Sequence, residues 1–450
     1  MEKITEQEIG LGRECLSQAL SKGASAARIV IDKNTTNSIE TLNGEIDKVS
    51  HCMDKSLSIS IFADGRYGSF STNRIDGDHL SEFVENAVKT TAMLAVDRCR
   101  MLPSPERCCK EAADGDELGL YDLMIEAMNS DMRRSVSLKA SIFAETKNHK
   151  ELPWELISEE GEYSDTLSDF LLIDSNGTFC RHTESSFDYS VEMTVADKDG
   201  NRYSGFDWDG CCRLDDLDIM NCGRKALGMA VAGIGPGNVE SGKYNVVIDA
   251  RNSRKLLNPL IRALRGEELH QNNSFLKDSL GKSVLPQGLT LVECSRKCGE
   301  AGARLFDHEG VDIPAGPVIE NGVVKKYFLN TRMSGKLGLP PTVDGLYHPQ
   351  LLPFPEKGLD RDAILALCGD GIYVTGFNGG NYNHATGNFS YGIEGFAFRN
   401  GKITHPVREM VFTGNFLRLW SGLLAVGSDN FPEHGKMMPT LAFAQADLSA

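Results

Sequence analysis

Histidine and cysteine side chains are the residues of this chain that could bind a metal. The 450 residues include 10 histidines and 12 cysteines, and a zinc site needs three or four such ligands at a workable spacing. No His-Glu-x-x-His sequence occurs. Cys294 and Cys298 are four residues apart, so a helix could place both on one face, but no second cysteine pair or histidine pair lies nearby. We therefore expect no metal ligands in this chain.

The remaining cysteines are expected to serve packing. Cys108-Cys109 and Cys211-Cys212 are adjacent pairs, which cannot form the separated tetrahedral arrangement of a zinc site by themselves. The N-terminus lacks the charged-then-apolar pattern of a secretory signal, and no run approaches eighteen apolar residues. We expect a cytoplasmic protein without a membrane span, whose cysteines are reduced thiols packed as small hydrophobic side chains.

The segment Asp307-His308-Glu309-Gly310 places a histidine between two carboxylates. This combination could carry out acid–base chemistry, although its turn-like flanks fit a solvated loop equally well. No Gly-x-Ser-x-Gly elbow occurs, and no particular Cys–His pair can be singled out as a nucleophile and its base. From these residues alone, we assign no catalytic residue and no substrate-binding residue.

Two further segments combine small, polar and aromatic residues. Residues 204–210 (Ser-Gly-Phe-Asp-Trp-Asp-Gly) could form a ligand-contacting loop, or a tight turn capped by carboxylates. Residues 377–390 are rich in glycine and asparagine, so their backbone could approach another chain or a ligand closely. This second segment lacks the Gly-Lys-Ser/Thr ending of a phosphate-binding loop.

The N-terminal part of the chain predicts a mixed α+β domain. Thr5 and Glu8 have the spacing of a capping box, which predicts a helix that ends near Gly23. Residues 27–71 predict an antiparallel meander with turns at Asn43-Gly44 and Asp64-Gly65. Asp78 is the expected cap of a second helix over this sheet.

Further along, residues 101–119 are predicted to form a loop, followed by short helices around residues 123–128 and 136–144. Residues 170–174 predict a strand, and Asn176-Gly177 and Asp199-Gly200 predict hairpins. We expect these later strands to form a second sheet layer.

A glycine- and proline-rich segment at 233–238 marks the expected domain boundary. We predict an N-terminal α+β domain at 1–235 and a C-terminal β-rich, barrel-like domain at 236–450. In the second domain, residues 253–268 predict a single helix with one apolar face. The fold class is therefore α+β.

Charge excludes one class of partner. The formal net charge is −16 and the isoelectric point is near 5.2, whereas binding to nucleic acid requires clustered lysine and arginine. We expect no direct contact with nucleic acid.

Several segments in order resemble the TldD/PmbA family, also known as the modulator of DNA gyrase family. They cover nearly the whole chain and include residues 40–46 (Glu-Thr-Leu-Asn-Gly-Glu-Ile), 62–68 (Phe-Ala-Asp-Gly-Arg-Tyr-Gly), 241–249 (Ser-Gly-Lys-Tyr-Asn-Val-Val-Ile-Asp), 274–282, 306–311 and 386–396. Proteins of the TldD branch carry His-Glu-x-x-x-His on the helix after the Ser-Gly-Lys-Tyr strand, with a further cysteine near the C-terminus completing a zinc site.

In this chain Leu257, Asn258 and Arg262 correspond to the His, Glu and His of that motif. Leucine has no lone pair for a metal, asparagine cannot take a proton from zinc-bound water, and arginine places a permanent cation against Zn²⁺. His434 falls near the position of the TldD cysteine, and we expect it to be an ordinary surface or interface residue. The resemblance therefore identifies the chain as a PmbA (TldE)-type member without its own metal.

For such a member, the resemblance implies a heterodimer with a zinc-bearing TldD-like metalloprotease subunit that cleaves unfolded or short peptides in a closed chamber. Two alternatives stay open. The chain could be a stand-alone hydrolase with a site around His384, His434 or residues 307–309. It could also be a peptide-binding protein that forms a homodimer through its β-rich half.

Overall fold

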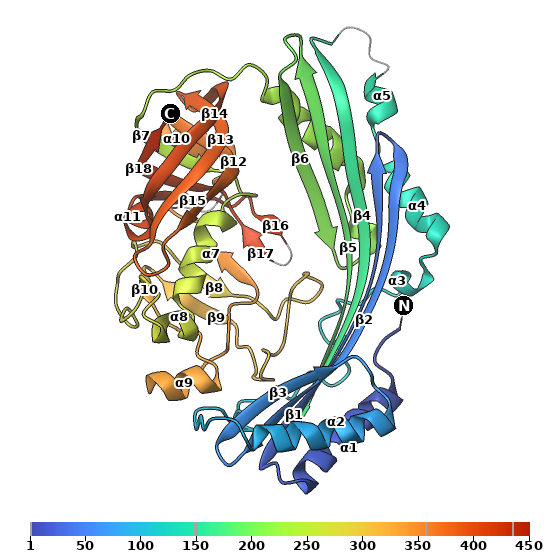
Figure 1. Cartoon of the computed structure of the whole chain (residues 1–450). Coiled ribbons are helices and arrows are strands. Elements are labelled where there is room, and N and C mark those ends of the chain that lie inside the picture. The colour runs from blue at the N-terminus through green and yellow to red at the C-terminus, as the bar shows by residue number, and fades with distance from the viewer. Residues whose placement is uncertain (1, 148–151, 356–357, 434–435) are drawn as a thin grey trace.

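The structure, a computed structural model, describes residues 2–147, 152–355, 358–433 and 436–450. Figure 1 shows a tall N-terminal sheet facing a C-terminal body of shorter strands. Within the described residues, the strands form three six-stranded sheets. The chain is thus a mixed α+β protein, as the sequence predicts.

The N-terminal sheet is antiparallel, with the strand order β3-β2-β1-β4-β5-β6. Its strands are β1 (Ala26–Leu42), β2 (Glu45–Ala63), β3 (Arg66–Thr72), β4 (Trp154–Asp174), β5 (Phe179–Asp197) and β6 (Arg202–Cys211). The predicted meander and hairpins are confirmed. The expected second layer is wrong, because β4 pairs with β1 from Arg28↔Asp174 to Leu42↔Glu160 and extends the same sheet.

Two helices cover the lower part of this sheet. Helix α1 (Glu6–Ser21) begins with the predicted capping box between Thr5 and Glu8. Helix α2 (Gly77–Thr91) is capped by Asp76 rather than by Asp78, because the Asp76 carboxylate accepts the His79 N–H at 3.0 Å. Their apolar faces enclose a core with the isoleucines of β1 and β2.

The upper part carries α3 (Met124–Ala127), α4 (Ser130–Lys139), α5 (Phe143–Lys147), a 3₁₀ turn (Leu214–Asp216) and α6 (Ile219–Ala232). Helix α6 was not predicted from the sequence. This helix packs on β5 and β6 through the small residues Cys222, Gly223, Ala226 and Ala230. A Cβ atom at Gly205 of β6 would lie 2.1 Å from the Ala226 carbonyl oxygen, so the helix requires glycine there.

The C-terminal half contains a closed five-stranded barrel, as predicted. Strands β14-β13-β12-β7-β18 follow one another, and β14 pairs with β18 to complete the ring. The bounds are β7 (Gly242–Ile248), β12 (Gly371–Tyr382), β13 (Asn388–Arg399), β14 (Lys402–Asn415) and β18 (Leu441–Ser449), with β15 (Leu423–Val426) added beside β18.

The third sheet lies below the barrel in Figure 1 and has the order β10-β9-β8-β11-β17-β16. Its strands are β8 (Leu291–Glu293), β9 (Gly316–Glu320), β10 (Val323–Val324), β11 (Pro349–Leu351), β16 (Phe431–Glu433) and β17 (Lys436–Met438). The remaining helices are α7 (Arg254–Ala263), α8 (Gly266–His270), α9 (Thr331–Leu337), α10 (Arg361–Cys368) and α11 (Phe416–Ser421).

The single helix predicted for residues 253–268 is instead divided into α7 and α8. Arg265 has an extended backbone between them (φ −78°, ψ 139°). The Gly266 N–H donates to the Phe328 carbonyl at 2.8 Å instead of continuing the helix. A tertiary hydrogen bond has therefore replaced an intrahelical one.

The two halves meet along a seam built from the predicted loop at 101–119 and from residues 294–313. Cys109 donates its N–H to the Gly310 carbonyl, and Asp312 donates its N–H to the Arg107 carbonyl. Cys180, Leu172 and Phe306 belong to one buried cluster that spans both halves. None of the helices in the described part of the chain is long and apolar enough to cross a bilayer.

Candidate functional site

Helix α7 occupies the position where the sequence resemblance places a metal-binding motif. Asp249 at the end of β7 holds the start of the helix, since its carboxylate accepts the Arg251 N–H at 3.0 Å and the Tyr373 hydroxyl. Leu256, Leu260 and Leu264 are completely buried in the main C-terminal core. One face of α7 is therefore fixed in the interior.

The three residues at the motif positions do not converge on one point in space. Leu257 is 0% exposed and lies in the same core, whereas Asn258 is exposed. The Arg262 guanidinium lies 2.7 Å from the Glu268 carboxylate in an ion pair. Zinc does not fit this arrangement, because the three residues offer an apolar side chain, a neutral amide and a cation. In the described ranges, no group of three or more His, Cys, Asp or Glu side chains is placed to hold a metal ion.

The exposed face of α7 is cationic and borders aromatic rings. Lys255 Nζ lies 4.9 Å from the centre of the Tyr391 ring. Burial raises the pKa of Tyr382, and the nearby Arg262 opposes that rise. His384 packs edge-on against Tyr382, with 4.4 Å between the ring centres. His384 thus has an aromatic neighbour, and His434 lies outside the described residues.

The segment at 377–390 forms the end of β12, a turn and the start of β13. A Cβ atom at Gly380, whose φ is +94°, would lie 2.2 Å from the Ser390 carbonyl oxygen. The close backbone approach expected from the glycines is therefore made to the neighbouring strand of the same hairpin.

Residues 307–309 lie at the seam between the two halves and join a polar cluster. His308 Nδ1 lies 3.0 Å from Asp344 Oδ2 and 2.9 Å from the Tyr347 hydroxyl. Tyr347 also donates to Asp344 Oδ1 at 2.5 Å. Asp307 is fully buried and accepts the N–H groups of Glu309, Val311 and Asp344. Asp307 shapes a turn, as expected for a loop, whereas His308 has an acidic partner, as acid–base chemistry would require.

The protonation states in this cluster follow from burial and charge. Burial and the nearby Asp344 carboxylate raise the pKa of Asp307. Burial also acts to raise the pKa of Asp344, but the hydrogen bonds with His308 and Tyr347 outweigh it and lower that pKa. Burial and the Asp344 charge raise the pKa of Tyr347 far above its ordinary value. The Tyr347 phenol therefore stays protonated at neutral pH and is a poor nucleophile.

Residues 204–210 form neither a ligand-contacting loop nor a tight turn. They lie within β6, paired with β5. Asp207 is 1% exposed and forms an ion pair with Arg251 from the loop before α7. Trp208 meets Phe431 edge-on at 5.4 Å between ring centres. The aromatic and acidic residues of this segment thus join the two halves of the molecule.

All twelve cysteines are free, and seven of them are buried. Cys298 is exposed in a turn after β8, and Cys294 Sγ lies 3.5 Å from Gln350 Oε1, so the helical face considered for this pair does not form. A hydrogen bond between the Cys109 and Cys180 thiols lowers the pKa of Cys109 and raises that of Cys180. The cysteines act mainly as small core residues.

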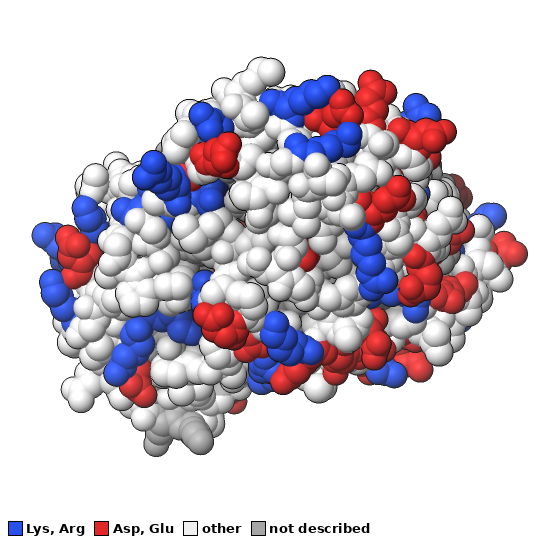
Figure 2. Space-filling view, turned by 90° about the horizontal axis from the view of Figure 1, so that it is seen from below, with Lys and Arg blue, Asp and Glu red and all other residues white. Residues whose placement is uncertain are grey.

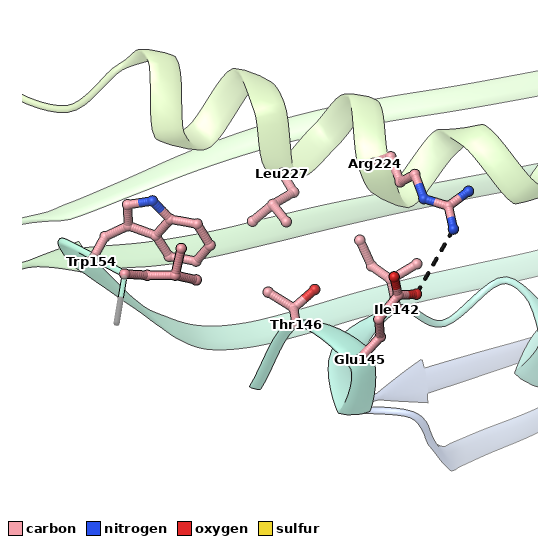
Figure 3. A pocket seen from close by; sticks show the side chains of 7 residues that line it. Ile142, Glu145, Thr146, Trp154, Arg224 and Leu227 are labelled. Atoms are coloured by element: carbon pink, nitrogen blue, oxygen red, sulfur yellow. Dashed lines mark ion pairs between the residues drawn. The ribbon is translucent and has the colours of Figure 1, made fainter. Parts of the chain in front are cut away.

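Two cavities lie away from these groups. The larger one, of about 880 Å³, opens at the end of the barrel where β7 begins and includes Lys243, Asp370 and His405. The smaller one, of about 310 Å³, lies between α5, α6 and β4 (Figure 3), where Trp154 and Leu227 line it and Arg224 pairs with Glu145 at 3.8 Å. The smaller cavity is mainly apolar, and its two charged lining residues, Glu145 and Arg224, pair with each other.

The surface charge is mixed. On the face shown in Figure 2, Lys and Arg side chains are interspersed with Asp and Glu. Such a surface does not provide the concentrated positive charge that binding to a nucleic acid backbone requires.

The partners of His308 and Arg251 could not be identified from the sequence. Asp344 is 36 residues from His308, and Asp207 is 44 residues from Arg251. Such separations leave no local spacing pattern, so only the tertiary structure brings these groups together.

Comparison with known proteins places most of the chain in one set of relatives. Residues 27–91, 126–234 and 241–450 match the models for PmbA/TldA metallopeptidase domain 1, central domain and C-terminal domain. Metalloprotease PmbA of Escherichia coli O157:H7 is 25% identical over 439 residues, which cover 95% of this chain and 92% of the relative.

Two solved structures resemble this chain over almost its whole length. A proposed modulator of DNA gyrase from Bacteroides thetaiotaomicron is 34% identical, with a TM-score of 0.92 and coverage of 99% of this chain and 100% of the other. TldE from Thermococcus kodakarensis, 16% identical, shares the fold with a TM-score of 0.82 and coverage of 98% and 100%.

Proposed function

The chain belongs to the PmbA/TldD metallopeptidase family, and we propose that it is a non-catalytic, PmbA/TldE-type subunit. In this proposal it forms a cytoplasmic heterodimer with a zinc-bearing TldD-like protein. The heterodimer cleaves unfolded or short peptides, and this chain contributes to the chamber around them.

One observation carries the proposal. At the positions of the TldD motif, Leu257 is buried in the core, Asn258 is exposed, and Arg262 is held by Glu268. Restoring a zinc site would require a change of chemistry at all three positions and a rotation of α7 to bring residue 257 out of the core. The geometry of the helix and the chemistry of its residues both oppose metal binding.

Peptide binding by the subunit is proposed to use strand edges. Among the described strands, β6 pairs with β5 on one side only, so its other edge presents unpaired main-chain groups. An extended peptide can add to such an edge through main-chain hydrogen bonds, with little dependence on its sequence. Phe206 on β6 is 51% exposed and offers an apolar contact beside this edge.

The test is to measure zinc content and peptidase activity of the purified chain alone, and again after mixing with a TldD-type protein from the same source. We expect no zinc and no cleavage by the chain alone, and cleavage by the mixture above that of the TldD-type protein alone. Stoichiometric zinc in this chain, or cleavage without a partner, would refute the proposal.

A stand-alone hydrolase is the second candidate, and the contact between His308 and Asp344 is the observation that favours it. His308 has a side chain that is 66% exposed and an acidic partner at 3.0 Å, which is a geometry suited to proton transfer. Cleavage by the zinc-free chain alone, abolished by His308→Ala and retained in His384→Ala, would support this candidate. Equal activity of both variants would exclude the 307–309 site.

A further inference from the structure

One edge of the N-terminal sheet is open along half of strand β2. Strand β3 covers β2 only from Leu57 to Ala63, where Leu57 pairs with Thr72. Residues 45–56 have β1 on one side and no described strand on the other. In Figure 1 this part of β2 rises at the margin of the sheet. An open strand edge presents unpaired N–H and C=O groups that can pair with another chain.

The side chains of this open segment are unusually exposed for their type. Val49 is 64% exposed and Met53 is 61% exposed, whereas Leu57, Ile59 and Ile61 further along the same strand are completely buried. Apolar side chains on an unpaired edge are the combination that favours strand pairing between molecules.

The sequence of the open segment is complementary to itself when it is read in opposite directions. Residues 47–55 are Asp-Lys-Val-Ser-His-Cys-Met-Asp-Lys. In an antiparallel pair centred on His51, Lys48 faces Asp54 of the second copy, and Val49 faces its Met53. Lys48 also pairs with Glu40 of the neighbouring β1 strand at 2.7 Å, so it would lie between two carboxylates. Asp47 likewise faces Lys55, whose ammonium group also lies 3.0 Å from the Glu8 carboxylate of its own chain. Opposite charges and apolar side chains that lie directly across two strands stabilise their pairing.

This register is favoured over its neighbours. A two-fold axis perpendicular to the sheet keeps each face of the joined sheet continuous. Two residues that face each other must therefore both be odd-numbered or both be even-numbered, and the next possible registers shift each facing partner by two residues. Either shift separates Lys48 from Asp54 and places Val49 opposite His51 or Lys55. If the charges of this segment protected its edge from pairing, like charges would face each other in the register centred on His51.

The length of the unpaired segment of β2 also fits this register. With His51 at the centre, Ile46 faces Ser56 of the second copy. One step further, Glu45 would face Leu57, whose outer side is already occupied by β3. The β1–β2 turn at Asn43-Gly44 ends the strand at the same point. The pairing therefore fills the window between this turn and β3.

We propose that two copies of this chain associate through residues 46–56 of β2, in antiparallel register around a two-fold axis at His51. The association joins the two N-terminal sheets edge to edge into one continuous sheet. This inference rests on the strand edge alone and does not depend on the proposed function.

Charge exchange tests the pairing with single substitutions. Lys48→Glu places two carboxylates opposite each other at the pair of positions 48 and 54, and Asp54→Lys places two ammonium groups there. The two-fold axis repeats this pair, so each variant alone brings like charges together twice. Lys198→Glu, an exposed residue in the β5–β6 turn, is the control for the change in net charge. Asp54→Lys is the cleaner edge variant, because Lys48→Glu also removes the ion pair of Lys48 with Glu40 inside the chain. The full-length variants are compared by sedimentation velocity, with circular dichroism to check their folding.

We expect the wild-type chain and Lys198→Glu to dimerise, and each edge variant to dissociate at least about tenfold more readily. An equimolar mixture of Lys48→Glu and Asp54→Lys should recover the dimer, because every facing pair is again of opposite charge. A wild-type chain that stays monomeric at about 100 μM, a concentration far above the dissociation constant of a stable dimer, would overturn the proposal. Edge variants that dimerise like wild type, or a mixture that does not recover, would do the same.

A disulfide tests the register directly. In His51→Cys combined with Cys52→Ser, residue 51 of each copy faces its counterpart across the axis, within reach of a disulfide. Mild oxidation should produce a covalent dimer that reduction reverses, and Lys198→Cys combined with Cys52→Ser should not. Failure of the cysteine introduced at position 51 to cross-link, in a chain that dimerises, would overturn the proposed register.

Discussion

Replacement of Arg251 by methionine tests whether its ion pair with Asp207 holds the two halves of the molecule together. Asp207 lies on β6 and is 1% exposed, and Arg251 precedes α7. The next cation, Lys225, is 4.0 Å from Asp207 and 47% exposed. Methionine keeps an apolar contact with Phe431, whose ring centre lies 4.8 Å from the guanidinium. The substitution therefore removes mainly the charge that compensates a buried carboxylate.

The magnitude follows from burial. Removing one partner of a buried ion pair typically costs about 3–5 kcal/mol, because the remaining charge is left uncompensated. Lys225 and protonation of Asp207 limit this loss, so we expect the free energy of unfolding to fall by about 2–3 kcal/mol at pH 7.5. Loss of the cation–aromatic contact adds about 0.5–1 kcal/mol.

The loss should depend on pH. Burial already raises the pKa of Asp207 in the wild type, against the effect of Arg251, and removing Arg251 raises it further. A carboxyl whose folded pKa is raised stabilises the fold at low pH, and this stability is lost as the pH rises from the unfolded pKa of about 4 to the folded pKa, by up to about 1.4 kcal/mol per pH unit. The defect of Arg251→Met should therefore be smaller at pH 5 than at pH 7.5.

The assay is urea unfolding at pH 5 and pH 7.5 of wild type, Arg251→Met, Asp207→Asn and the double variant. We expect a coupling free energy of about 2 kcal/mol at pH 7.5, since the double variant leaves no buried charge at this pair. Additive effects of the two substitutions, or a defect of Arg251→Met that is the same at both pH values, would refute the reasoning.

Four other substitutions test the structure elsewhere. Burial acts to raise the pKa of Glu8, but hydrogen bonds from Thr5 and Lys55 outweigh it and lower that pKa to about 2, so Glu8→Gln should remove about 2 kcal/mol of stability at pH 7 and progressively less as the pH falls from about 4.5 toward 2 in urea titrations. Gly205→Ala should destabilise the fold by about 3 kcal/mol, because its Cβ would meet the backbone of α6. A Cβ at Gly228, within α6 itself, meets nothing within 4 Å, so Gly228→Ala should stabilise the fold by up to about 1 kcal/mol. Thermal unfolding measures both effects. Leu257→His, which restores one residue of the metal motif, should lose about 3 kcal/mol of stability and bind no stoichiometric zinc in elemental analysis, because the side chain lies in the core. An unchanged stability of Glu8→Gln, equal effects of the two glycine changes, or a stable zinc-loaded histidine variant would each contradict the corresponding argument.

The sequence by itself determined the local elements and the family. The capping box at Thr5 and Glu8, the turns at Asn43-Gly44 and Asp64-Gly65 and the hairpin at Asn176-Gly177 all form as predicted, since each depends on residues a few positions apart. The barrel-like character of the C-terminal half and the TldD/PmbA resemblance were also readable, because both are spread over many short segments.

The tertiary structure alone decided how these elements join. Whether β4 starts a new layer or extends the first sheet depends on its pairing with β1, which is a long-range choice between hydrogen-bond partners. The break between α7 and α8 follows from one hydrogen bond between Gly266 and Phe328, which no helical periodicity can reveal. The contacts of His308 with Asp344 and of Arg251 with Asp207 likewise join residues that are distant in sequence. The spacing of residues a few positions apart determines the helices, strands and turns. Which charged side chains are buried and which strand edges are covered is decided only when the two halves pack together.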